Sequence, residues 1–164
     1  MTVITSSDVT YDNVDRLNEL FLAADMESTP VSDGRSNDRV DVFFSSTEED
    51  ANLNAVVMVW VQGGVQEDGH EILRFRVQLF DKKEMTTFQK NSELWDDINR
   101  EIEMVNQSAY GFVATSSLFG ITLDYTLTMA GGVLDATVIN SAKNMASKAQ
   151  SVKSIILDEV AFVD

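Results

Sequence analysis

Apolar and polar residues alternate strictly over residues 121–129, ITLDYTLTM. The apolar residues occupy the odd-numbered positions and the polar residues the even-numbered ones. Because successive side chains of a β-strand point to opposite faces, this pattern predicts a strand with one face on a core and the other in water. A pair of glycines follows, and from Leu134 the apolar spacing becomes helical.

Four further segments are predicted to be strands. They cover residues 39–46, 54–62, 71–80 and 110–116. The segment 54–62, NAVVMVWVQ, differs from the others because both of its faces are apolar. Such a run is typical of a central strand that is buried on both faces, or buried on one face and adhesive on the other.

Helical spacing of apolar residues predicts three helices, at about 10–25, 85–106 and 134–160, the second with an interruption near Asn91. Residues 28–39 contain the only proline, Pro30, and are predicted to form a loop or a short irregular edge. The resulting order is α-β-β-β-α-β-β-α. It indicates an α+β fold, an antiparallel sheet of about five strands with helices packed on one face, in a single domain over residues 1–164.

Residues 95–139 resemble the YbjN-type family of bacterial sensory transduction regulators. The positions that carry the resemblance are two dipeptides with asparagine near the end of a helix, two aromatic residues of a strand, one glycine in a turn and a pair of glycines before the last helix. They are Ile98-Asn99, Val105-Asn106, Tyr110, Phe112, Gly120, Gly131 and Gly132. The resemblance implies the fold of type III secretion chaperones. Such chaperones are small, acidic and often dimeric, and they bind extended segments of other proteins.

Composition and charge narrow the classes of function. The 164 residues have no cysteine, which excludes a disulfide framework, thiolate zinc sites and a cysteine nucleophile. The net charge is −15, and residues 1–104 hold 22 of the 27 acidic and 9 of the 12 basic residues. Such a field repels nucleic acid and anionic membranes and favours basic protein partners. With no signal peptide and no apolar run near the roughly 20 residues of a membrane span, a cytoplasmic protein is expected.

The candidates for catalytic or metal chemistry are weak. The one histidine, His70, lies among Glu67, Asp68 and Glu71, and a lone loop histidine is more often solvated than ligated to a metal. The acidic groups Glu48-Glu49-Asp50 and Asp33, Asn37, Asp38, Asp41 lack the spacing of a calcium loop.

The two Gly-rich segments, GGVQEDG and MAGGVLDA, lack the lysine of a phosphate loop, and Asp135 already complements the start of the last helix. We therefore expect no cofactor, no metal and no enzymatic activity.

The strand AVVMVWV is the feature that a structural role alone does not explain. If helices cover one face of the sheet, either Val57, Val59 and Val61 or Val56, Met58 and Trp60 lie on the uncovered face, beside Arg74 and Arg76. An uncovered apolar patch marks an interface.

The sequence therefore predicts a chaperone-like or regulatory protein-binding module that forms a homodimer. The alternatives are an acidic decoy that imitates nucleic acid, or a structural component of a phage or secretion machine.

Overall fold

The computed structural model describes residues 3–4, 14–32, 38–46, 53–62, 72–108, 110–129 and 132–163. Within these residues an antiparallel sheet has the strand order β2-β3-β4-β5-β7-β6. Its strands are β2 Glu27–Val31, β3 Arg39–Phe44, β4 Ala55–Gln62, β5 Ile72–Asp81, β6 Val113–Ser117 and β7 Gly120–Thr128. A separate two-stranded sheet joins β1 (Val3–Ile4) to β8 (Val133–Leu134).

The four helices are α1 Val14–Ala23, α2 Lys82–Gln89, α3 Ser92–Gln107 and α4 Asp135–Val163. The α+β class and the antiparallel sheet expected from the sequence are confirmed. The main sheet has six strands rather than about five, because Glu27–Val31, expected to be a loop or irregular edge, pairs with β3 along its whole length. Pro30 is tolerated there because β2 is an edge strand, where a missing N–H need not break a ladder.

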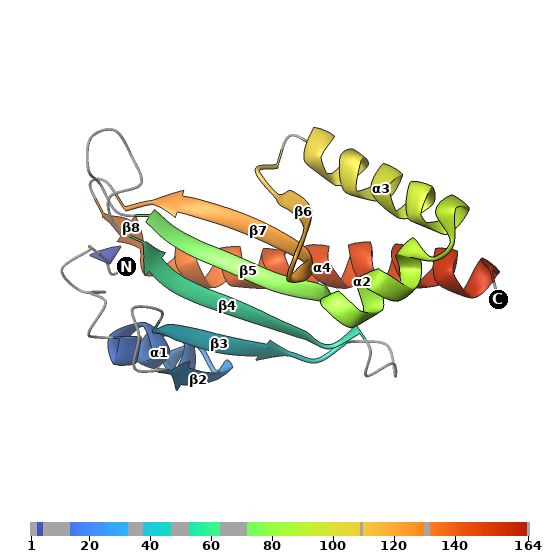
Figure 1. Ribbon diagram of the computed structural model, residues 1–164. Helices are drawn as coiled ribbons and strands as arrows, with labels where there is room; N and C mark the ends of the chain where they lie inside the picture. Colours follow the sequence, from blue (N-terminus) through green and yellow to red (C-terminus); the bar gives the residue numbers. More distant parts are fainter. Residues whose placement is uncertain are drawn as a thin grey trace.

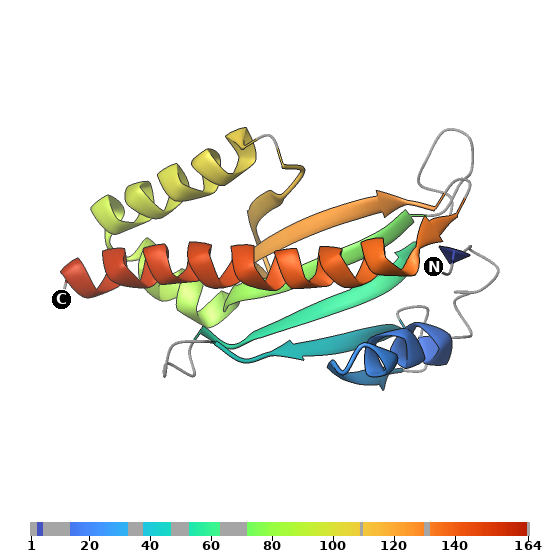
Figure 2. The same ribbon diagram turned by 180° about the vertical axis from the view of Figure 1, so that it is seen from behind.

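Helices α4 and α1 lie over the same face of the main sheet (Figures 1 and 2). Helix α4 packs against β4, β5 and β7, while α1 packs against β2 and β3. Of the described helices, none lies over the middle of the opposite face (Figure 1). We call that opposite face the open face.

The buried side chains form one core between the sheet and α4 and α1. In β4 this core takes Val57, Val59 and Val61, which are 0%, 0% and 6% exposed. The alternative in which these three valines face a partner is therefore wrong. Alternation along the strand places Val56, Met58 and Trp60 on the open face instead.

The interruption expected near Asn91 is confirmed, because the predicted 85–106 helix is divided into α2 and α3 at that residue. Asp81 caps α2 through a reciprocal capping box with Glu84. The side chain of Asn91 accepts a hydrogen bond from the N–H of Leu94 and so begins α3. The Asn91 cap therefore divides one apolar stripe into two helices.

Candidate functional site

The open face carries an apolar patch that crosses β3 and β4. We define this patch as Phe43, Val56, Met58 and Trp60. Phe43 lies opposite Val56 in the ladder, and the three β4 residues follow each other at every second position, so the four side chains share one face. Phe43 and Val56 are 41% and 37% exposed, and Met58 and Trp60 are half-buried. The patch is thus a continuous apolar strip that solvent reaches.

Arg76 connects the patch to the neighbouring strands. It lies opposite Met58 in β4 and opposite Asp124 in β7. Its guanidinium carbon is 5.4 Å from the centroid of the Trp60 ring, and its Nε donates to Asp124 Oδ1 at 2.7 Å. The ion pair fixes the plane of the guanidinium beside the indole, which keeps both side chains in one arrangement.

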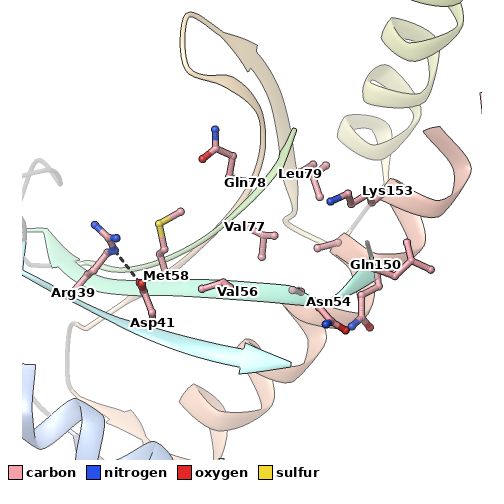
Figure 3. Close-up of a pocket in the computed structure, with 13 residues that line it drawn as sticks. Arg39, Asp41, Asn54, Val56, Met58, Val77, Gln78, Leu79, Gln150 and Lys153 are labelled. Atoms are coloured by element: carbon pink, nitrogen blue, oxygen red, sulfur yellow. Dashed lines mark hydrogen bonds and ion pairs between the residues drawn. The ribbon is translucent and has the colours of Figure 1, made fainter. Parts of the chain in front are cut away.

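A second ion pair flanks the patch on β3. Arg39 Nε donates to Asp41 Oδ1 at 2.8 Å, two residues along the same face of the strand (Figure 3). Arg39, Met58, Trp60 and Arg76 line a shallow hollow of about 250 Å³. Two of the arginines that border the apolar patch, Arg39 and Arg76, are therefore each held by a carboxylate.

Arg74 lies opposite Trp60 in β4 and opposite Thr126 in β7. Its Nε is buried and finds no hydrogen-bond partner within the described part of the chain. It lines a hollow of about 380 Å³ together with Arg76, Thr115 and Thr126. The open face thus offers a guanidinium donor, Arg74 Nε, that the described residues leave without an acceptor.

Of the residues predicted to lie on an uncovered face or beside it, the structure brings together Val56, Met58, Trp60, Arg74 and Arg76. It places Val57, Val59 and Val61 in the core. Sequence analysis did not identify Phe43, Arg39 or Asp41 as neighbours of this strand. The alternation in RVDVFF places all three on one face of β3, but only the register of β3 against β4 shows that this face adjoins Trp60. Asp124 was predicted to face water, and it is instead half-buried in its ion pair with Arg76.

Among the described residues, no group of three or more His, Asp or Glu side chains could hold a metal ion. His70 with Glu67, Asp68 and Glu71, the run Glu48-Glu49-Asp50, and Asp33 with Asn37 lie outside the residues that the structure describes. Of the remaining candidate ligands, Asp41 is paired with Arg39, and Asp38 accepts a hydrogen bond from Ser32 at 2.8 Å.

The helices in the described part of the chain include none with both the length and the apolar character needed to cross a bilayer.

No protein-family model, curated protein or solved structure matches this chain. The chemistry of the site therefore has to be inferred from its own residues.

Proposed function

We propose that this protein is a non-enzymatic protein-binding module that docks a partner on the open face and self-associates. The observation that carries the proposal is the strip of Phe43, Val56, Met58 and Trp60 on a sheet face without a helix over it. Large side chains of this kind are costly to leave in water, and Trp, Met and Arg are enriched at the centres of interfaces.

The arginines beside the strip support the same proposal. Arg39 and Arg76 are already paired with Asp41 and Asp124, so a partner that covers them need not supply every counter-charge. A guanidinium that is already paired with a carboxylate costs less free energy to bury in an interface than an unpaired one. A largely apolar partner surface with a small number of hydrogen-bonding groups suits this arrangement.

A chaperone-like or regulatory role in the cytoplasm is the specific form of the proposal. Its support is the resemblance of residues 95–139 to the YbjN-type regulators and, through them, to type III secretion chaperones. The absence of cysteine suits a reducing compartment. A scaffold role in a phage or secretion machine would use the same surface.

The acidic decoy is a weaker candidate. Its support is the net charge of −13 in residues 1–104. A protein that imitates nucleic acid, however, needs carboxylates in continuous rows. On the open face, Asp41 and Asp124 are each neutralised by an arginine. The described residues of this face therefore form no such row, and binding of a protein is the better explanation of them.

Sedimentation velocity over a range of protein concentrations, combined with a pull-down from the source cell, tests the proposal. Trp60→Asp should weaken self-association or partner binding by about 30-fold or more, since interface hot spots contribute roughly 2 kcal/mol or more. The control is Leu118→Asp, which places the same charge at a residue that is 79% exposed in the turn between β6 and β7. A wild-type chain that stays monomeric and retains no partner would overturn the proposal.

A further inference from the structure

Strands β4 and β5 separate along part of their length. Their ladder runs from the pair Gln62–Ile72 to the pair Met58–Arg76. Beyond that point β4 continues to Ala55 along β3, and β5 continues to Asp81 along β7. Figure 3 shows the two strands diverging on the side of Gln150 and Lys153. The separation leaves a slot within the sheet rather than at its edge.

A β-bulge in β5 explains why the slot forms. The register against β7 shifts between Gln78 and Phe80, which leaves Leu79 as an extra residue in β5. A bulge bends its strand and increases the local twist, and here it turns β5 away from β4. Both Leu79 and Phe80 are buried as a result, at 2% and 1% exposure. The core therefore holds the bulge, and with it the slot, in place.

The slot has a small volume of about 300 Å³, and its lining is polar and apolar in equal measure. The walls of the slot are formed by Val56 and Met58 of β4 and by Val77 and Leu79 of β5. Helix α4 closes the slot on the core side of the sheet. A volume at the lower end of the range for ligand pockets fits a small molecule or the end of a chain.

The polar groups on the α4 side of the slot are hydrogen-bond donors. Nε2 of Gln150 is buried and has no hydrogen-bond partner among the residues that the structure describes. The Oδ1 of Asn54 accepts from the N–H of Ser46 at 2.9 Å, which leaves the Nδ2 of Asn54 to donate. Lys153 contributes a cation, its Nζ 5.4 Å from the centroid of the Phe80 ring. Native proteins rarely leave buried donors without an acceptor, so a ligand that brings acceptors suits this end.

The backbone adds to this set of donors. Alternate residues of a strand direct their N–H and C=O groups to opposite neighbours. At least one residue of Ala55–Val57 therefore directs both groups toward the slot, where β5 no longer pairs with it.

We propose that the slot binds a small apolar monocarboxylate. The carboxylate accepts hydrogen bonds from Gln150 and Lys153, which are three residues apart on α4 and so lie on one side of the helix. The apolar body packs against Val56, Met58, Val77 and Leu79. Asp41, at the other end of the slot, is paired with Arg39. Such a ligand is either a free aliphatic acid or the carboxyl terminus of a peptide that ends in an apolar residue. The slot shares Val56 and Met58 with the apolar patch on the open face. The acid can nevertheless be titrated into the chain alone, so this proposal can fail while docking of a partner holds, or hold while docking fails.

Titration of the full chain, followed by calorimetry and by the methyl NMR signals of Val56, Val77 and Leu79, tests the proposal. The probes are octanoate and 1-octanol, and acetyl-Gly-Gly-Leu with a free or an amidated carboxyl terminus. At least one of the two acids should bind with one-to-one stoichiometry and shift these methyl signals. Its neutral counterpart should bind about tenfold more weakly or worse, because a hydrogen bond to a charged group is lost. Which acid binds identifies the source of the carboxylate.

Two substitutions on α4 locate the carboxylate. Lys153→Met should weaken binding by about tenfold or more. Gln150→Glu keeps the size of the side chain and adds a like charge, so it should also weaken binding. Lys148→Met is the matched control, because Lys148 lines a different hollow with Tyr110 and Phe112, and it should leave the affinity unchanged. Thermal unfolding of each variant checks that the fold is retained.

Three results would overturn the proposal. Neither acid binds, in which case water alone satisfies Gln150. The neutral probes bind as tightly as the acids, in which case the slot has no preference for a carboxylate. Or the Lys153→Met and Gln150→Glu variants both fold and bind like the wild type, in which case the acid sits elsewhere.

Discussion

The side chain of Asn106 makes both of its amide hydrogen bonds to the backbone of one residue, Ala114. Its Oδ1 accepts from the N–H of Ala114 at 2.7 Å, and its Nδ2 donates to the carbonyl of Ala114 at 2.9 Å. Asn106 lies in the last turn of α3, and Ala114 lies in the edge strand β6. The amide occupies the position of a peptide group from a further strand and so protects the free edge of the sheet.

Asn106→Ala should lower the free energy of unfolding by about 1–3 kcal/mol, because it leaves both backbone groups of Ala114 without their partner. Urea unfolding followed by circular dichroism measures the change. Asn140→Ala is the control, because Asn140 is an exposed residue of α4, and it should change the stability by less than about 0.5 kcal/mol. Equal stabilities of the two variants would show that the Asn106 amide contributes nothing.

Gly120→Ala should be among the most damaging substitutions in the chain. Gly120 has a φ of +122°, and a Cβ there would lie 2.1 Å from the carbonyl oxygen of Phe80. The backbone strain and the clash together should cost about 3 kcal/mol or more, or prevent folding. Gly111→Ala is the comparison, because its φ is +79° and the nearest atom is a ring carbon of Tyr125 at 3.3 Å. It should cost about 1 kcal/mol, so similar melting temperatures for the two variants would contradict the difference.

The two faces of β4 should respond differently to truncation. Val59→Ala removes buried methyl groups from the core and should lower the stability by about 2 kcal/mol. Met58→Ala, one residue away on the open face, should cost less than half as much, since Met58 is only half-buried. Chemical denaturation of both variants gives the comparison. The comparison is made at concentrations at which the chain is monomeric, and a larger loss for Met58→Ala there would contradict its place on an uncovered face.

The ion pair between Arg76 and Asp124 should contribute little to stability. The two side chains are 36% and 18% exposed, and partly exposed pairs are typically worth about 0.2–1 kcal/mol. A double-mutant cycle with Arg76→Met and Asp124→Asn measures this coupling, and raising the salt concentration should reduce it. A coupling energy that salt leaves unchanged would argue against a solvent-screened pair.

The helices and most strands of this fold were predictable because each carries its own periodic pattern. The alternation in β5 and β7 and the apolar stripes of α3 and α4 are local properties of the sequence. Residues 28–39 were predicted to be a loop or a short irregular edge because Pro30 and its polar neighbours are typical of a loop. Only pairing with β3 makes Glu27–Val31 a regular edge strand. The short β1–β8 pair was not predicted because a strand of two residues is too short to show a periodic pattern.

The candidate site was predictable only in part. The alternation in AVVMVWV predicted that one of two sets of side chains faces away from the core, but it did not indicate which set. The choice depends on which face α4 covers, and this is a property of the whole sheet. The slot beside Met58 was not predictable either, because the register shift at Leu79 has no signature in the alternating segment EILRFRVQLF.

Helix α4 spans 29 residues without a break. At a rise of 1.5 Å per residue its length is about 43 Å. Strand β1 pairs with β8 directly before the first residue of α4, so Val3 and Val163 lie at opposite ends of the helix (Figure 1). The length of α4 therefore sets the distance between these two positions, and fluorescent labels there should report one separation whether or not a partner is bound.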